Sequence, residues 1–131
     1  MQSHTGSFYL HVTYCILLAG RPRAVVTGAN KGIGFETCRQ LLGAGVSVVV
    51  TGRSLERGEE ATSRLRREPN GHLVLGFVEM DVADNDSVSR SVPRISDLVE
   101  GELDLIVNNA GVGYPDRFFG AAEAHDIENV N

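Results

Sequence analysis

The sequence predicts an α/β domain that holds part of a doubly wound parallel sheet, with strand order 3-2-1-4 and helices on both faces. Three observations lead to this fold class. The β-branched run Ala24-Val25-Val26 passes directly into the octapeptide Thr27–Gly34, whose glycines are spaced i, i+4 and i+6. Strand-like segments then alternate with helix-like segments of about ten to fifteen residues, as in right-handed βαβ units. Finally, Val48-Val49-Val50 is a continuous apolar run typical of a strand buried on both faces.

The first predicted strand is Ala24–Thr27, and the helix after the glycine loop runs from Ile33 to about Leu42. Helical spacing places four residues on or near its buried face: Ile33, Cys38, Leu41 and Leu42. Gly43 and Gly45 end this helix, because glycine readily adopts the left-handed backbone found at helix ends.

The second predicted strand is Val46–Thr51. Ser54 is the expected N-cap of a helix that runs to about Arg67, since a serine side chain can accept a bond from the first helical turn. The residues expected to point inward from this helix are Leu55, Ala61 and Leu65. Glu60 and Arg64 are spaced for an i,i+4 ion pair.

The third strand is expected at Leu73–Met80, followed by a helix that Asp84 caps and that extends to about Val99. Pro93 should kink or divide this helix, because proline lacks the backbone N–H and clashes with the preceding turn. The fourth strand is expected at Leu103–Val107.

The composition limits the function. The 131 residues allow one domain, and 42% hydrophobic with 22% charged residues is ordinary for a soluble globular protein. The formal charge of -5 argues against a nucleic-acid backbone as the main partner. Cys15 and Cys38 suggest neither a disulfide framework nor a metal site, so a reduced, cytoplasmic protein is expected.

Residues 1–22 are interpreted as an N-terminal extension to a domain at 23–131. The apolar run at 8–19 is too short, and too interrupted by polar residues, to span a membrane. A signal peptide would carry positive charge ahead of that run, and residues 1–7 hold no Lys or Arg. A disordered or loosely packed extension is expected, with a signal or anchor segment as the alternative.

The glycine loop has a chemical meaning of its own. A strand, a tight turn and a helix start place exposed N–H groups at the first helical turn, with the helix dipole behind them. Such an arrangement binds a diphosphate. The loop therefore predicts a dinucleotide ligand.

The spacing Thr-Gly-x-x-x-Gly-x-Gly resembles the glycine motif of the short-chain dehydrogenase/reductase family. Asn108-Asn109-Ala110-Gly111, about eighty residues later and at a strand end, resembles that family's second signature. The stretch from Val25 to Glu36 looks most like the plant carbonyl-reductase branch, and the resemblance covers roughly residues 23–113. It implies a Rossmann domain that binds a nicotinamide dinucleotide.

The resemblance assigns roles within the glycine loop. Gly28, Gly32 and Gly34 would permit the turn, let the backbone approach the diphosphate and allow close helix–strand packing. The residues that would line the loop are Asn30, Lys31 and Ile33.

The resemblance also assigns roles after the third and fourth strands. Asp81 matches the family aspartate that hydrogen-bonds the adenine amine, and its alternative role is that of a turn or capping residue. Asn109, with Ala110 and Gly111, would form the wall beside adenine and ribose. Asn108 would tie the strands of the sheet together.

Charge indicates the choice of cofactor. NAD-selective sites usually carry an acidic residue at the end of the second strand, and Val50–Ser54 holds none. Arg53 instead offers a planar donor fork suited to a 2′-phosphate, and Lys31 can supply a second positive charge. The alternative is that both are solvated loop charges. The combination predicts NADP(H).

Hydride transfer in the family depends on Tyr-x-x-x-Lys, in which tyrosine is the general acid/base and lysine lowers its pKa. Lys31 is the only lysine of this chain, so none of its three tyrosines is followed by that lysine. Asn131 is the candidate for the family's catalytic asparagine. We therefore expect a C-terminally incomplete chain that carries the cofactor-binding half.

Two functions follow. One is an NADPH-dependent oxidoreductase of the carbonyl-reductase type, acting on a small carbonyl substrate. The alternative is a catalytically inactive nucleotide-binding module. A methyltransferase with a similar glycine loop is disfavoured by the second motif and by Arg53. An interior parallel strand left at the sheet edge would also favour self-association of the chain.

Overall fold

A computed structural model describes residues 20–111, which form a four-stranded parallel sheet with helices on both faces. The strand order is β3-β2-β1-β4, so the predicted fold class is confirmed. The elements, in order, are β1 (Arg23–Val26), α2 (Gly32–Gly43), β2 (Ser47–Gly52), α3 (Leu55–Leu65), the 3-10 turn η1 (Gly71–Leu73), β3 (Val74–Glu79), α4 (Asn85–Leu98) and β4 (Leu105–Val107).

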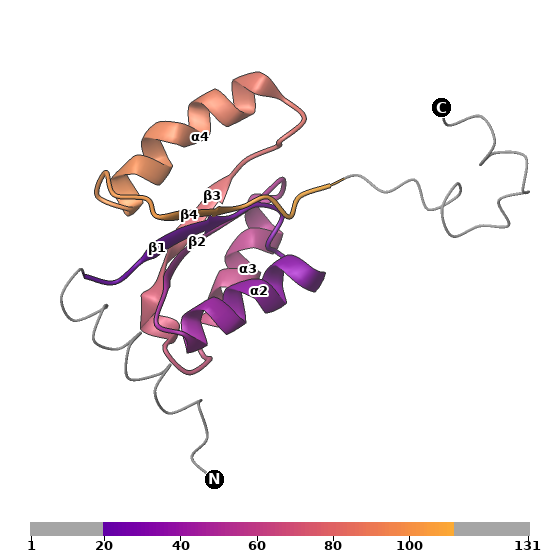
Figure 1. Cartoon of the computed structure of the whole chain (residues 1–131). Helices are drawn as coiled ribbons and strands as arrows, with labels where there is room; N and C mark the ends of the chain where they lie inside the picture. Colours follow the sequence, from indigo (N-terminus) through magenta and orange to yellow (C-terminus); the bar gives the residue numbers. More distant parts are fainter. Residues whose placement is uncertain (1–19, 112–131) are drawn as a thin grey trace, which may run out of the picture.

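Helices cover both faces of the sheet, α2 and α3 on one side and α4 on the other (Figure 1). The alternation of side chains along each strand produces two cores. Val26, Val48 and Val50 belong to the core beneath α2 and α3. Val25 and Val49 belong to the core beneath α4. The valine run of β2 is therefore buried on both faces, as the sequence predicts.

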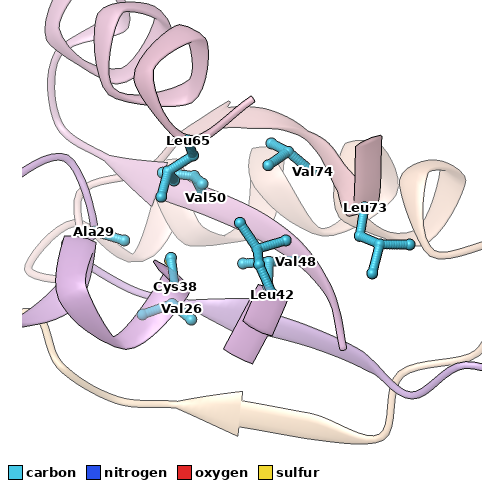
Figure 2. Packing of buried hydrophobic residues seen from close by; sticks show 9 residues of the cluster. All are labelled: Val26, Ala29, Cys38, Leu42, Val48, Val50, Leu65, Leu73 and Val74. Atoms are coloured by element: carbon cyan, nitrogen blue, oxygen red, sulfur yellow. The ribbon is translucent and has the colours of Figure 1, made fainter. Parts of the chain in front are cut away.

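The larger core lies between the sheet and the pair α2 and α3, and Figure 2 shows its nine buried side chains. Cys38 and Leu42 of α2 meet Leu65 of α3 and the valines of the central strands. Each fully buried Val or Leu side chain stabilises the fold by about 1.5–3 kcal/mol relative to an exposed one. This core holds the start of α2 against the end of β1, where the glycine loop lies.

Of the three α-helices within residues 20–111, two begin with a side-chain cap. The Ser54 hydroxyl accepts from the Arg57 amide at 3.4 Å, and the Asp84 carboxylate accepts from the Asp86 amide at 2.9 Å. Both N-caps were expected from the sequence. At the start of α2, by contrast, Lys31 makes no side-chain cap bond and the first turn carries no acidic residue.

The structure corrects two predicted core positions. Ile33 is 79% exposed and Leu55 is 49% exposed, although both were expected to point inward. Each lies within the first two residues of its helix. Side chains on a helix point back toward its N-terminus, so those of the first turn project past the start of the helix and are less covered than those of later turns.

Two further expectations are corrected in the helices. Helix α4 runs unbroken through Pro93, so the proline does not divide it; Pro93 lies on the exposed face. Arg64 does not pair with Glu60 within residues 20–111. Its guanidinium lies over the Phe35 ring instead, 4.6 Å from the centroid, and so links α3 to α2.

Strand β4 is shorter than expected and lies at the edge of the described sheet. Within residues 20–111 it pairs with β1 alone. Its residues Leu105 and Ile106 are 42% and 55% exposed. Among the helices of the described residues, none is long and apolar enough to cross a membrane.

Candidate cofactor site

A cleft of about 600 Å³ opens where the strands end at their carboxyl termini. In doubly wound sheets this edge, beside the strand where the order reverses, is the usual ligand site. The sequence-predicted residues that line the cleft are Gly28, Asn30, Lys31, Gly32, Ile33, Arg53, Asp81, Asn109, Ala110 and Gly111. Of the predicted binding residues within 20–111, Gly34 alone does not line it.

The three loop glycines are required for three different reasons. Gly28 has φ +60°, and a Cβ on it would lie 2.8 Å from the Ala110 Cα. Gly34 is buried, and its Cβ would meet the Asn109 amide nitrogen and lie 2.6 Å from the Gly28 carbonyl oxygen. Gly32 also has φ +60°, but nothing lies within 4 Å of its Cβ position. The space above Gly32 is thus open to a ligand.

Hydrogen bonds join the glycine loop to the motif after β4. The Asn109 side-chain amide donates to the carbonyl oxygens of Thr27 and Gly28, both at 3.1 Å. The Thr27 hydroxyl accepts from the backbone amides of Asn109 and Ala110, both at 3.0 Å. Residues 82 positions apart in sequence therefore fix each other at the base of the cleft.

This network corrects the prediction for the asparagine pair. Asn109, and not Asn108, ties the strands together, while it also lines the cleft. Asn108 is exposed, and its side chain makes no hydrogen bond to any of residues 20–111. Sequence reasoning did not single out Thr27 as a site residue. Thr27 directly precedes Gly28, and its hydroxyl can both donate and accept a hydrogen bond. This position and this chemistry were the available signal for its role.

The α2 N-terminus faces this cleft without a cap. Lys31 and Gly32 line the cleft, and the first backbone bond of α2 runs from the Phe35 amide to the Lys31 carbonyl oxygen at 3.4 Å. The earlier amides of the helix are left without helical partners. Together with the open space above Gly32, they offer donors to an anionic group.

The cleft carries two cationic side chains, Lys31 and Arg53, both exposed. Arg53 follows the last residue of β2, and no acidic residue stands at that strand end. Asp81 is the one acidic residue that lines the cleft within residues 20–111. Its Oδ1 accepts from the Ala83 amide at 3.0 Å, so its turn-forming role is present, while Oδ2 makes no such bond there.

Four further residues line the cleft that sequence reasoning did not assign: Gly52, Met80, Val82 and Ala83. Each lies within two residues of Arg53 or Asp81 in the sequence. Their closeness to the ends of β2 and β3 was therefore the signal that could have predicted them. Gly52 leaves room for the Asn30 side chain, whose Oδ1 would lie 3.2 Å from a Cβ at that position.

Within residues 20–111, the cleft does not contain the catalytic residues expected from the family resemblance. Residues 20–111 contain no tyrosine, and Asn131 lies outside them. Across the same residues, no cluster of His, Cys, Asp and Glu could hold a metal ion. Cys38 lies on the buried face of α2, where burial raises the pKa of its thiol to about 12, so the thiol stays protonated and unreactive.

Comparison with known proteins agrees with this geometry. A family model for short chain dehydrogenases matches residues 22–131. The (+)-neomenthol dehydrogenase of Capsicum annuum is 48% identical over 92 residues, which cover 68% of this chain and 28% of that protein. The chain therefore spans less than a third of the length of this curated relative.

Solved structures show the same likeness. Menthone neomenthol reductase from Mentha piperita matches with a TM-score of 0.64 and 46% identity, over 70% of this chain and 32% of that chain. An actinorhodin polyketide ketoreductase variant solved with NADPH matches with a TM-score of 0.62 and 30% identity, over 70% of this chain and 34% of that chain. The chain belongs to the short-chain dehydrogenase family.

Proposed function

We propose that the cleft binds NADP(H) and that the chain supplies the cofactor-binding part of an NADPH-dependent carbonyl reductase. The observation that carries this proposal is the pair Lys31 and Arg53 at the cleft, with no acidic residue where β2 ends. A 2′-phosphate would find two cationic donors there, whereas a ribose 2′-hydroxyl would find no carboxylate acceptor. Family membership and the NADPH-bound ketoreductase relative support a nicotinamide cofactor.

The described residues fit the parts of such a dinucleotide. The open space above Gly32 and the uncapped start of α2 suit the diphosphate. Asp81, held by its turn bond to Ala83, keeps one carboxylate oxygen available for the adenine amine. Asn109 and Ala110 supply the wall against which adenine and ribose would pack. The bound cofactor would supply a hydride, and these residues would hold and orient it.

The substrate part of the proposal concerns the whole protein. A small carbonyl compound is proposed as the substrate, since the relatives are oxidoreductases of one family. Asn131 remains a proposed catalytic residue, and a cytoplasmic location remains a prediction. The alternative is a nucleotide-binding module without turnover.

The cofactor proposal is tested by titrating the 131-residue chain with NADPH and with NADH, following nicotinamide fluorescence. We expect tighter binding of NADPH. Arg53→Ala should weaken NADPH binding by about 10- to 100-fold, because a hydrogen bond to a charged group contributes about 1.5–3 kcal/mol. Its effect on NADH should be small, and Lys31→Ala should act in the same direction.

The matched control is Arg94→Ala, which removes an exposed arginine on α4 away from the cleft. It should leave both affinities unchanged. Equal losses for NADPH and NADH in Arg53→Ala would contradict the 2′-phosphate role, and failure to bind either nucleotide would overturn the proposal. Oxidation of NADPH by the chain with a simple ketone or quinone would exclude the module without turnover.

A further inference from the structure

Helix α4 contacts the residues that follow β3 through two serines one helical turn apart, Ser87 and Ser91. The Ser87 hydroxyl oxygen accepts from the Asp81 amide at 2.9 Å, and the Ser91 hydroxyl donates to the Met80 Sδ at 3.1 Å. Met80 and Asp81 both line the cofactor cleft, whereas neither serine does. The helix is therefore bonded to two consecutive residues of the cleft wall.

Of these two contacts, the one made by Ser87 is the stronger constraint. The Ser91 hydroxyl also donates to the Val88 carbonyl oxygen of its own helix at 2.7 Å, and a carbonyl oxygen is a better acceptor than a thioether sulfur. The Asp81 amide lies between β3 and α4, outside both elements, so no ladder or helix bond competes for it. Its bond to Ser87 satisfies a backbone donor that would otherwise be left without a partner.

Three hydrogen bonds hold Asp81 in place. Its amide donates to Ser87, its carbonyl oxygen accepts from the Asp84 amide at 3.1 Å, and its Oδ1 accepts from the Ala83 amide at 3.0 Å. The last two bonds lie inside the turn of residues 81–84, whereas the Ser87 bond joins this turn to α4. Because the rotamer of a side chain depends on its backbone, fixing the amide and the carbonyl also fixes the direction of the carboxylate.

The Asp81 carboxylate has one oxygen left for a ligand. Its Oδ1 is occupied by Ala83, and its Oδ2 makes no hydrogen bond to residues 20–111. An ionised carboxylate can only accept hydrogen bonds, so the ligand group beside it must be a donor. The 6-amino group of adenine is such a donor, whereas the 6-oxo group of hypoxanthine would set oxygen against oxygen. A site built to bond an N–H group rejects an analogue that lacks it.

We propose that Ser87 is a positioning residue for the choice of base: by holding the Asp81 amide, it directs the second carboxylate oxygen at the 6-amino group of a purine. This role rests on the proposed NADP(H) function, and it adds a selectivity for adenine over hypoxanthine. Ser87 acts through Asp81, since it does not line the cleft itself. Loss of its hydroxyl frees the turn of residues 81–84 from α4, and the carboxylate then loses its fixed direction.

A direct test compares NADPH with its hypoxanthine analogue, in which oxygen replaces the 6-amino group. Both are titrated against the 131-residue chain by nicotinamide fluorescence. The unmodified chain should bind NADPH about tenfold or more tightly than the analogue. Ser87→Ala should lower this preference by about three- to tenfold, and Ser87→Thr, which keeps a hydroxyl, should retain it. The matched control Ser89→Ala removes an exposed hydroxyl from the same helix and should leave the preference unchanged.

Two further comparisons separate positioning from a general loss of structure. Asp81→Ala should abolish the preference for NADPH over the analogue, and adding Ser87→Ala to it should change the preference no further. In Ser87→Ala alone, the preference for NADPH over NADH should stay unchanged, because the cations proposed for the 2′-phosphate are untouched. Equal weakening of NADPH, NADH and the analogue in Ser87→Ala would indicate a structural role only and would overturn the proposal.

Hydrogen exchange of the unmodified chain gives a measurement that needs no variant to fold. The Asp81 amide should be protected from exchange at least about tenfold more than the Val82 amide, which bonds no acceptor among residues 20–111. Equal protection of the two amides would mean that the Ser87 bond does not persist in solution, and would overturn the proposal.

Failure of this role is distinguishable from failure of the cofactor proposal. An unmodified chain that prefers NADPH to NADH, but binds the hypoxanthine analogue as tightly as NADPH, would overturn the role of Ser87 and leave the NADP(H) proposal standing. An unchanged base preference in Ser87→Ala would do the same. A chain that binds none of the three nucleotides would overturn both.

Discussion

Asn109 is the residue on which the geometry of the cleft depends most. Its side-chain amide bonds two carbonyl oxygens of the glycine loop, and it lies against the Cβ position of Gly34. A glycine at 34 is therefore needed because of a side chain that comes 75 residues later in the sequence, on another strand end. Local sequence patterns contain no signal of this long-range packing.

Asn109→Ala tests this dependence. It should lower the free energy of unfolding by about 1–3 kcal/mol, because two part-buried carbonyl groups lose their donor. NADPH binding should weaken in parallel. Asn108→Ala is the matched control, and for an exposed side chain we expect a change within about 0.5 kcal/mol. Urea unfolding gives both values. Equal effects of the two variants would restore the role first predicted for Asn108.

Cys38 predicts a loss of stability at alkaline pH. Burial raises its pKa from 9.0 to about 12, so the folded state keeps a proton that the unfolded state loses. The contribution to stability is therefore full below pH 9 and is lost between pH 9 and pH 12, at about 1.4 kcal/mol per pH unit. Urea unfolding at pH 8 and pH 10 measures the loss.

The control for this loss is Cys38→Ala, which has no thiol to titrate and should show a smaller difference between the two pH values. In a Cys15→Ser background, Cys38 should react with a thiol reagent only after unfolding. Rapid labelling of the native protein at pH 8 would contradict the raised pKa.

At the scale of single elements, the structure confirms the predicted sequence of strands and helices. The valine run of β2, the caps Ser54 and Asp84, and the apolar spacing of the helices are local signals, so they can be interpreted without a structure. Ile33 and Leu55 could not be placed in this way. Helical periodicity gives the direction of a side chain but not whether a sheet lies beneath that turn.

Pro93 shows a similar limit. The rule that proline breaks a helix is based on two local effects, the lost backbone hydrogen bond and the clash of the ring with the preceding turn. On the exposed face of α4, water can satisfy the carbonyl that loses its donor, and the inner face of the helix packs through Ile95 and Leu98. Tertiary packing therefore outweighs the local cost.

The uncapped start of α2 leads to a prediction for the element itself. Lys31 has the extended backbone of an N-cap, φ -159° and ψ 170°, but no side chain that can accept a bond. Lys31→Ser should stabilise the fold by about 0.5–1 kcal/mol through a new cap. The same change should weaken NADPH binding, because it removes the lysine ammonium group. The new serine side chain would also occupy a backbone amide that is otherwise open to the diphosphate. Thermal melting and nucleotide titration measure the two effects.

Ser54→Ala serves as the control for Lys31→Ser. It removes the existing cap of α3, where the hydroxyl accepts from Arg57, and should destabilise the fold by about 1 kcal/mol. Its effect on NADPH binding should be small, since Ser54 does not line the cleft. Stability and binding that change in the same direction in Lys31→Ser would contradict the role of the open helix start.

At the scale of the whole molecule, the edge of β4 leads to a prediction about copies of the chain. The 131-residue chain should self-associate as its concentration rises, because Leu105 and Ile106 are exposed on a strand that pairs with β1 alone among residues 20–111. Sedimentation velocity at several concentrations measures the change. Ile106→Lys should reduce self-association by placing a charge on this strand.

A chain that stays monomeric at all concentrations would contradict this prediction. The open edge itself was foreseen from the sequence, because strand four of a doubly wound sheet is ordinarily interior. An apolar groove of about 380 Å³ between α4 and the sheet is not predicted by the sequence. It depends on how α4 lies over the sheet, which no spacing of apolar residues specifies.

The bonds between Thr27 and Asn109 also set an order of events during synthesis. A ribosome completes the glycine loop 75 or more residues before it adds Asn109, so the nascent chain carries the loop long before the wall that closes the cleft. Contacts of such separation form late, because a long loop must first close. Binding of the proposed nucleotide would then report that β4 has docked beside β1.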